Sequence, residues 1–297
     1  MGRKGNSGYT NPDFRFGNGS TGYSGSLGFT QHYLERRDGD LPPEILPAPG
    51  YTIWTRSTDG VTVDGSNFVS EWADKSGNGL DFTSLDTGGG FNDRDPSFNA
   101  SNSNLNNLPS IDMDKDVDDG QAMETADDAK LSVSGTGGFC AYAVLNINNF
   151  SSFSFIMART NGSSWTRGWG VFYYSGDYRF FINNWNSSST RVALANVSNT
   201  TSPYIFKLHY DNSTITAAIV GNANTRNGTK SYSSTVNESG ISQGIQLNYG
   251  GSTNPGTYQG DWDFGEFLFY NSPINAADQL QTEKYLRLRY NITGEFT

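Results

Sequence analysis

Short runs of aromatic and β-branched residues recur along most of this chain, and each run ends at a turn sequence. Six of these runs cover residues 139–147, 153–158, 168–174, 178–183, 204–210 and 214–220. The tripeptides Ser175-Gly176-Asp177 and Asp211-Asn212-Ser213 each join two of the runs as a hairpin. Short strands at this spacing are typical of an antiparallel β-sandwich, and a sandwich of about 250 residues folds as one domain. We therefore expect an all-β fold with one domain over residues 50–297.

The first 49 residues differ from the rest and predict an extended N-terminal arm. Glycine recurs at every third position over residues 2–8 and 19–28, but the repeat breaks between these stretches and holds little proline, which excludes a collagen triple helix. A segment this rich in glycine cannot bury a core of its own, and four prolines within residues 42–49 form a stiff connector. Five aromatic side chains are the predicted anchors of the arm on a partner surface: Tyr9, Phe14, Phe16, Tyr23 and Phe29.

One helix is predicted near the C-terminus. Asn275 is placed to cap its first turn, and Asp278 adds a negative charge where the helix dipole favours one. The apolar residues that follow fall on one side of such a helix, so we expect this side to pack on the sandwich. They are Ala277, Leu280, Tyr285 and Leu288.

The charges and the apolar content argue against two classes of partner. The chain holds 20 Lys and Arg against 30 Asp and Glu, a net charge of −10, without a basic block. Nucleic acid is therefore not expected as a partner, because binding it requires clustered basic side chains. No apolar stretch approaches the roughly 20 residues that cross a bilayer, so no membrane insertion is expected. The single cysteine, Cys140, excludes an intramolecular disulfide.

The N-terminus and the composition together give an expectation for the compartment. Arg3 and Lys4 are not followed by the apolar stretch of a secretory signal, so no export signal is expected. The composition is nevertheless typical of an extracellular protein, with only 17% charged residues and 14% aromatic ones. A virion surface reconciles the two observations, because virion proteins are made without a signal and are released by lysis. The alternative is an extracellular protein that is exported by another route or cloned without its signal.

Two stretches at the ends of the sandwich domain carry a family resemblance. Residues 53–83, with Trp-Ala-Asp-Lys-Ser-Gly-Asn-Gly at 72–79, look like the opening of a laminin-G-like jelly roll of the concanavalin A-like superfamily. Residues 262–292, which begin Trp-Asp-Phe-Gly-Glu-Phe, are similar to the closing strand and helix of that family, and 108–113 resemble its second strand. The resemblance implies an antiparallel jelly-roll sandwich. It does not define an activity, because the family includes lectin-like modules, adhesins, bacteriophage surface proteins and glycosidases.

The closing stretch also holds the one candidate for glycosidase chemistry. In the glycosidase branch of the superfamily, a strand with the spacing Glu-x-Asp-x-x-Glu supplies the nucleophile and the acid/base. Residues 261–266 match this spacing and end in Glu266, but Asp261 stands in the first position. A retaining pair must lie about 5–5.5 Å apart, and the shorter Asp moves the nucleophile off the reacting carbon. Non-catalytic members carry a similar element, so we predict that Glu266 is an ordinary strand residue.

An acidic cluster between 112 and 119 is the weak candidate for a metal site. Ca²⁺ takes 6–8 oxygen ligands, which a cluster of carboxylates can supply. The spacing does not fit an EF-hand loop, because Lys115 would fall on the first ligand position. A solvated acidic turn is the default interpretation, and no other cofactor is predicted. The Ca²⁺ candidates are Asp112, Asp114, Asp116 and Asp118.

The region 165–185 is dense in aromatic residues, with nine in 21 positions. Alternate residues of a strand face opposite sides, so a hairpin here cannot bury all of these rings in one core. An exposed face of Tyr and Trp suits sugar stacking or a protein interface. In the alternative, loops of this same chain cover that face. The predicted glycan-binding residues are Trp165, Trp169, Tyr173, Tyr178 and Trp185.

These observations favour a non-enzymatic virion surface protein, namely a phage capsid decoration or head-associated protein. The arm would dock on capsid or other virion proteins, and the jelly roll would project outward, where it can bind cell-surface glycans. The chain lacks coiled-coil heptads and β-helix repeats, which disfavours a tail fibre. A carbohydrate-binding module or adhesin is the alternative function, and a glycoside hydrolase is a less favoured one.

Overall fold

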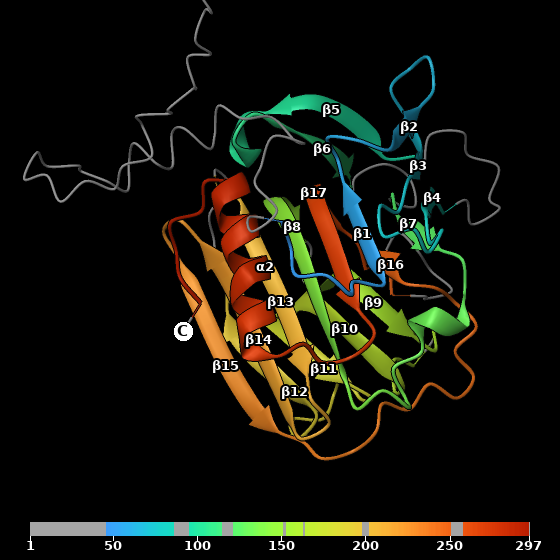
Figure 1. The fold of residues 1–297 in the computed structure, drawn as a ribbon, viewed down its shortest axis with the longest axis vertical. Helices are drawn as coiled ribbons and strands as arrows, with labels where there is room; N and C mark the ends of the chain where they lie inside the picture. The colour runs from blue at the N-terminus through green and yellow to red at the C-terminus, as the bar shows by residue number, and fades with distance from the viewer. Residues whose placement is uncertain are drawn as a thin grey trace, which may run out of the picture.

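Two antiparallel β-sheets lie face to face, and one helix covers the outside of one of them (Figure 1). The structure is a computed structural model, which describes residues 46–85, 95–114, 121–150, 153–162, 164–197, 202–250 and 258–296. The predicted all-β sandwich with one C-terminal helix is confirmed. The division into an arm of residues 1–49 and a domain of residues 50–297 stays a prediction, because residues 1–45 lie outside the described ranges.

The first sheet, called sheet A, carries the helix. Its strands run in the order β15-β14-β13-β8-β17-β6-β5, and β1 also pairs with β17. Their bounds are β1 Ile53–Arg56, β5 Ser97–Asn102, β6 Leu108–Met113, β8 Phe139–Phe150, β13 Tyr204–Tyr210, β14 Thr214–Gly221, β15 Thr225–Ser231 and β17 Gly260–Tyr270. A short 3₁₀ turn, η3 Ser103–Leu105, lies between β5 and β6.

The second sheet, called sheet B, runs in the order β12-β11-β10-β9-β16-β7-β4-β3-β2. Its strands are β2 Val61–Val63, β3 Val69–Trp72, β4 Phe82–Ser84, β7 Met123–Thr125, β9 Phe153–Thr160, β10 Gly168–Tyr174, β11 Asp177–Ile182, β12 Arg191–Ala195 and β16 Gln246–Leu247, with η4 Ala129–Leu131 after β7. The two hairpins predicted from the turn sequences are present, because β10 pairs with β11 and β13 pairs with β14.

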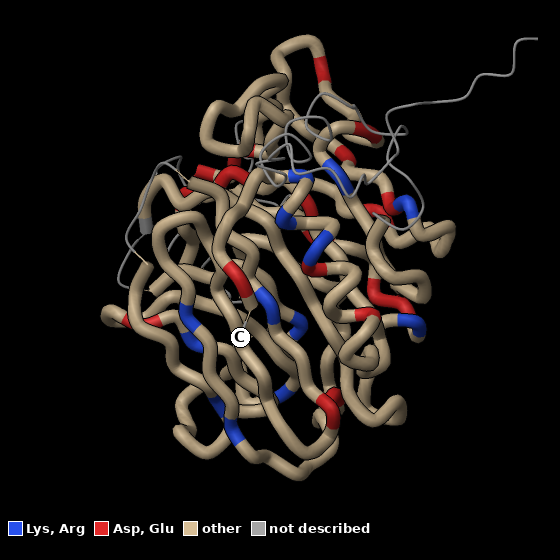
Figure 2. Tube along the Cα trace, turned by 60° about the vertical axis from the view of Figure 1, so that its left-hand side comes forward, with Lys and Arg blue, Asp and Glu red and all other residues tan. Residues whose placement is uncertain are grey.

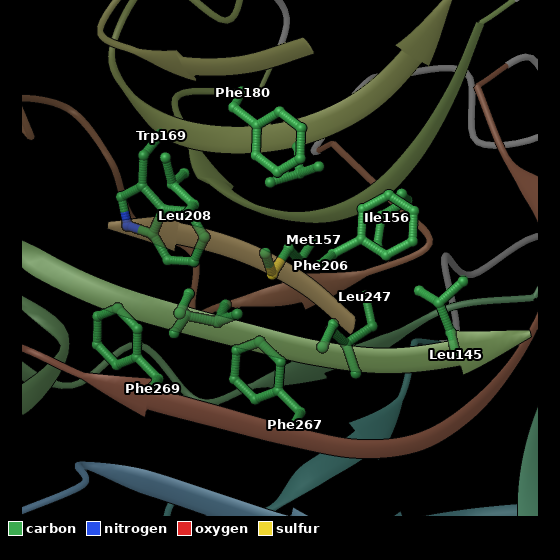
Figure 3. Close-up of a cluster of buried hydrophobic side chains, with 14 of the residues drawn as sticks. Leu145, Ile156, Met157, Trp169, Phe180, Phe206, Leu208, Leu247, Phe267 and Phe269 are labelled. Atoms are coloured by element: carbon green, nitrogen blue, oxygen red, sulfur yellow. The ribbon is translucent and has the colours of Figure 1, made fainter. Parts of the chain in front are cut away.

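The core lies between the two sheets and is built from their inward residues. Figure 3 shows Trp169 and Phe180 of sheet B on one side, with Phe267 and Phe269 of sheet A on the other. The rings of Trp169 and Phe269 are stacked, with centroids 5.5 Å apart and planes at 11°. All four side chains are fully buried, so this aromatic layer stabilises the sandwich from both sides.

The helix α2 (Ala276–Arg289) begins where the sequence predicts. The Asn275 side chain accepts hydrogen bonds from the backbone N–H groups of Ala277 and Asp278, at 2.9 and 3.0 Å. Figure 1 shows the helix lying along strands of sheet A. Among the helices of the described ranges, none is long and apolar enough to cross a membrane.

The face that α2 buries differs from the predicted apolar side. Leu280 is 66% exposed, so the expectation that it packs on the sandwich is wrong. The strands below the helix present apolar side chains, such as Val144 and Leu268, together with a few polar ones, and the buried face of the helix is mixed in the same way. Lys207 of β13 pairs with Glu283 at 2.5 Å, for example. The buried helix residues are Thr282, Glu283, Tyr285, Leu286 and Arg289.

Charged residues of the described chain are dispersed over several elements. In Figure 2 the Lys and Arg segments lie on separate parts of the trace and are mixed with Asp and Glu. Some form ion pairs, such as Arg56 with Asp59 at 2.6 Å and Lys75 with Asp59 at 3.1 Å. A ligand would therefore meet local groups of charge rather than one uniform field.

Candidate functional site: an aromatic platform on sheet B

Outward residues of β9 and β10 place a layer of aromatic rings on the outside of sheet B. The strand register sets Phe153 opposite Tyr174 and Phe155 opposite Phe172. Two tryptophans from neighbouring loops and Tyr258 complete the layer. We call this surface the aromatic platform. It consists of Phe153, Trp165, Phe172, Tyr174, Trp185 and Tyr258.

Phe153 is the centre of the platform. Its ring stacks on Phe172, with centroids 4.9 Å apart and planes at 11°, and on Trp165, at 5.2 Å and 27°. Tyr174 and Trp185 meet Phe153 edge to face, at 5.2 and 5.4 Å. These are the favoured geometries for aromatic pairs, so the rings hold one another in place without a covering helix or strand.

Trp165 is held in the platform with its backbone in a strained conformation. Its φ angle is +46°, in the left-handed region that bulky residues rarely adopt. The indole Nε1–H donates a hydrogen bond to the Gly250 carbonyl at 2.5 Å, and the side chain is only 7% exposed. Strained backbone of this kind persists only where the surroundings hold it, and it is concentrated at binding sites and active sites.

Trp185 lies at the accessible side of the platform. Its backbone N–H donates to the Trp165 carbonyl at 3.3 Å, and its own carbonyl accepts a hydrogen bond from Arg191 Nη1 at 3.0 Å. The indole ring makes edge contacts with Tyr174 and Phe172, at 5.8 and 5.7 Å. Tyr174, Trp185 and Tyr258 are half-buried, so a ligand can reach part of each of these rings.

Three of the five predicted glycan-binding residues lie on the opposite face of the hairpin. Trp169 and Tyr178 are fully buried, and Tyr173 is 8% exposed, in the core between the sheets. The prediction that these three line an exposed face is therefore wrong. Strand alternation explains the error, because these residues alternate with the outward ones along β10 and β11. The platform retains Trp165 and Trp185, whose role in glycan binding stays a prediction.

A polar cavity of about 720 Å³ lies between the end of β9 and the loop 234–239. Its lining includes Arg159, Ser132 and Ser134. Glu238 pairs with Arg159 and accepts hydrogen bonds from Ser132 Oγ and the Ser134 N–H, at 2.7 and 3.0 Å. Because these groups satisfy one another, the cavity offers a ligand fewer free partners than its size suggests. Its residues come from segments far apart in the sequence, and no motif pointed to them.

The glycosidase-like stretch at residues 261–266 does not place Glu266 in an accessible site. Glu266 is fully buried between β17 and α2. Its Oε1 accepts hydrogen bonds from Trp54 Nε1 at 2.7 Å and from the Tyr285 hydroxyl at 2.8 Å, and Arg289 Nε lies 3.1 Å from Oε2. Burial raises the pKa of Glu266 to about 7. A carboxyl enclosed in this way cannot reach a glycosidic bond, so its role here is structural.

The acidic candidates for Ca²⁺ divide between described and undescribed residues. Asp112 lies directly across the strand pair from Asp263, on the outer side of sheet A. Burial, together with the neighbouring Asp263, raises the pKa of Asp112 to about 7. Asp116 and Asp118 lie outside the described residues, and among the described ones no three acidic, His or Cys side chains are placed to hold a metal. A Ca²⁺ site involving Asp112 and Asp114 stays a prediction.

The predicted anchors of the arm cannot be placed. Tyr9, Phe14, Phe16, Tyr23 and Phe29 all lie outside the described residues. Their role in docking on a partner stays a prediction.

The sequence and the structure were compared with known proteins. No family model matches the chain, and no curated protein matches it. Among solved structures, the binding domain of botulinum neurotoxin serotype D/C matches 81% of this chain and 53% of its own length, at 12% identity and a TM-score of 0.54. The binding domain of botulinum neurotoxin DC in complex with SialylT matches 81% and 52%, at 11% identity and a TM-score of 0.53.

A third structure concerns botulinum neurotoxin type C, whose cell entry is described as dependent on two ganglioside molecules. It matches 81% of this chain and 52% of its own length, at 10% identity and a TM-score of 0.52. The chain spans about half the length of the solved structures that it matches. At these identities the likeness shows the fold alone, which is a β-sandwich shared with binding domains of botulinum neurotoxins.

Proposed function

We propose that this chain is a non-enzymatic glycan-binding protein whose ligand stacks on the aromatic platform. The observation that carries the proposal is the half-exposed group of Tyr174, Trp185 and Tyr258, on a sheet face that no described helix or strand covers. Amphipathic aromatic rings suit such a ligand, because the ring packs on apolar C–H groups while polar atoms at its edge stay hydrated. Two of the structures with this fold are described with SialylT or gangliosides, which supports the same class of ligand.

The platform suits binding better than catalysis. The rings are rigid and packed against one another, so a ligand gains contact area without the cost of ordering side chains. The carboxyl group that resembles a glycosidase acid is enclosed beneath α2, on the opposite sheet. These features support a module that binds sugars without cleaving them.

A glycan array with the full chain tests the proposal, with and without a chelator. We expect saturable binding, and we expect Trp185→Ala to weaken it about tenfold, which corresponds to a loss of ~1.4 kcal/mol. Tyr51→Ala is the matched control, because Tyr51 is a half-buried aromatic residue that packs on Trp54, outside the platform. No saturable binding, or equal affinity of wild type and Trp185→Ala, contradicts the proposal. Loss of binding on chelation would point to a Ca²⁺-dependent site away from the platform, such as the acidic cluster near Asp112 on sheet A, and would also contradict the proposal.

We further propose that the module is carried on a virion surface, where residues 1–49 dock on capsid or other virion proteins. The glycine-rich, aromatic composition of this segment and the low charge of the chain support this assignment. Removal of residues 1–45 tests it. We expect the truncated protein to fold and to lose particle binding. Wild-type occupancy of particles by the truncated protein would contradict the docking role and favour an extracellular module or adhesin.

A further inference from the structure

Two arginines lie beside the aromatic platform, on the same outer face of sheet B. Arg179 of β11 is paired in register with Phe172 of the platform, and Arg191 of β12 is paired with Phe181. Because Arg179 faces Ala193 on β12, the two arginines are diagonal neighbours on adjacent strands. Such neighbours lie about 7–8 Å apart, within reach of long side chains. Arg179 also stacks over Tyr174, with its guanidinium carbon 4.3 Å from the ring centroid.

These two cations lack a strong internal partner. Among the described residues, the Arg179 side chain makes no hydrogen bond, and its buried Nε is unpaired. Arg191 uses one Nη1–H to hold the Trp185 carbonyl. Burial and the charge of Arg191 lower the pKa of Arg179, and Asp177 at the start of β11 offsets this only in part. The guanidiniums therefore repel each other, on a chain whose net charge is −10.

We propose that the platform takes an acidic saccharide, whose ring stacks on Trp185 beside Tyr174 and whose carboxylate binds Arg179 and Arg191. This inference rests on the glycan-binding function and adds the ligand class and the residues that select it. A guanidinium that lies over an aromatic ring keeps its N–H groups in its own plane, directed away from the ring, where they can form paired hydrogen bonds to a carboxylate. The bound anion removes the repulsion between the two arginines. A neutral sugar would leave that repulsion in place.

The test compares sugars that differ in charge and little else. Calorimetric titrations use sialyllactose against its methyl ester, and oligogalacturonate against its methyl ester. For the wild type we expect the charged member of each pair to bind at least about tenfold more tightly, which is the size of one charge-assisted hydrogen bond. The preference is expected to shrink as salt is raised, because exposed charges are screened.

Variants of Arg179 test whether this residue causes the preference for charged sugars. Arg179→Gln is expected to abolish the preference for the charged sugars, and Arg179→Lys is expected to restore only part of it, because Lys binds as a point charge. Arg226→Gln is the matched control, since it removes one half-buried arginine from β15 of sheet A. We expect this control to keep the preference of the wild type.

The outcomes separate this inference from the proposed function. Equal binding of charged and neutral sugars, with loss of both in Trp185→Ala, overturns the acidic ligand and leaves glycan binding intact. Equal loss of preference in Arg179→Gln and Arg226→Gln shows that overall charge is responsible, and also overturns it. Absence of binding to any of the four sugars and to the glycan array overturns both proposals.

Discussion

The outer faces of the two sheets are covered to different extents. On sheet A the helix α2 covers the strands and encloses Glu266, Lys207 and Glu283. On sheet B, within the described residues, the loop carrying Trp165 covers the centre of the aromatic platform, and Trp185 is half-buried. The helix α2 closes the outer face of sheet A, whereas the described part of the chain leaves some of the outer face of sheet B accessible to a ligand.

Residue type alone does not indicate function on these two faces. The carboxyl group of Glu266, which resembles a catalytic residue in the sequence, is held by Trp54, Tyr285 and Arg289 inside the fold. Aromatic residues, which usually form cores, supply the accessible surface of sheet B. Location on a face, rather than residue type, therefore decides which groups can meet a ligand.

The largest expected loss of stability follows from a substitution on the outer face of sheet A, beneath α2. Glu266→Leu removes a buried carboxylate and leaves the Trp54 N–H, the Tyr285 hydroxyl and the Arg289 charge without their partner. Breaking a buried charge pair on one side costs about 3–5 kcal/mol. We expect a loss of this size in the free energy of unfolding, measured in urea. A loss below 1 kcal/mol, with sugar binding abolished, would instead place Glu266 in the binding site.

On the outer face of sheet B, a substitution in the aromatic platform should reduce ligand binding more than it reduces the free energy of unfolding. Trp185→Ala removes a half-buried ring that rests on Tyr174 and Phe172, and we expect it to lower the free energy of unfolding by about 1–2 kcal/mol. The same urea titration used for Glu266→Leu measures this difference. If Trp185→Ala destabilises the protein as much as Glu266→Leu does, the two faces are equivalent structural surfaces and the comparison fails.

Asp112, on sheet A, makes the stability of the folded protein depend on pH. Its pKa is about 7 in the folded protein, above its ordinary value of 3.8. The folded state therefore binds this proton more tightly than the unfolded state, so this group lowers stability as pH rises from about 4 to 7. We expect Asp112→Asn to gain stability relative to the wild type at pH 8 and to differ little at pH 4, in thermal unfolding. A bound Ca²⁺ would reverse the sign at pH 8, because the variant would lose a ligand.

The smallest effect is expected at the exposed side of α2. Leu280 is 66% exposed, so Leu280→Ser should change the free energy of unfolding by no more than about 0.5 kcal/mol. A clear loss of stability, or loss of self-association in sedimentation, would show that the helix face is covered by a partner. In that case sheet A is not closed by its helix alone.

Much of the fold was predictable because local patterns agree with it. The runs that became β8, β9, β10, β11, β13 and β14 were visible from their aromatic and β-branched residues, and Asn275 marked the start of α2. The face that each strand buries was harder to predict. Leu280 looked like a core residue, but α2 instead turns Tyr285 and Leu286 onto the apolar side chains beneath it, and leaves Leu280 exposed.

The site was predictable only in part, for the same reason. The aromatic density of residues 165–185 pointed to the right hairpin, but alternation alone does not say which set of residues faces the second sheet. Phe153 and Tyr258 come from other segments, and the loop that positions Trp165 depends on a distant carbonyl, that of Gly250. Arg179 alternates with Tyr178 and Phe180, so a charged residue at this position was the one sequence signal that this set of β11 residues faces outward.

The central claim is that ligands bind on the outer face of sheet B, and footprinting tests it most directly. Hydroxyl-radical labelling of the full chain, with and without saturating glycan, reports the protection of individual side chains. We predict protection of Tyr174, Trp185 and Tyr258, with Tyr51 unchanged. Protection confined to the cavity lining at residues 132–134 and 234–239, with Trp185 labelled equally in both states, would contradict the account.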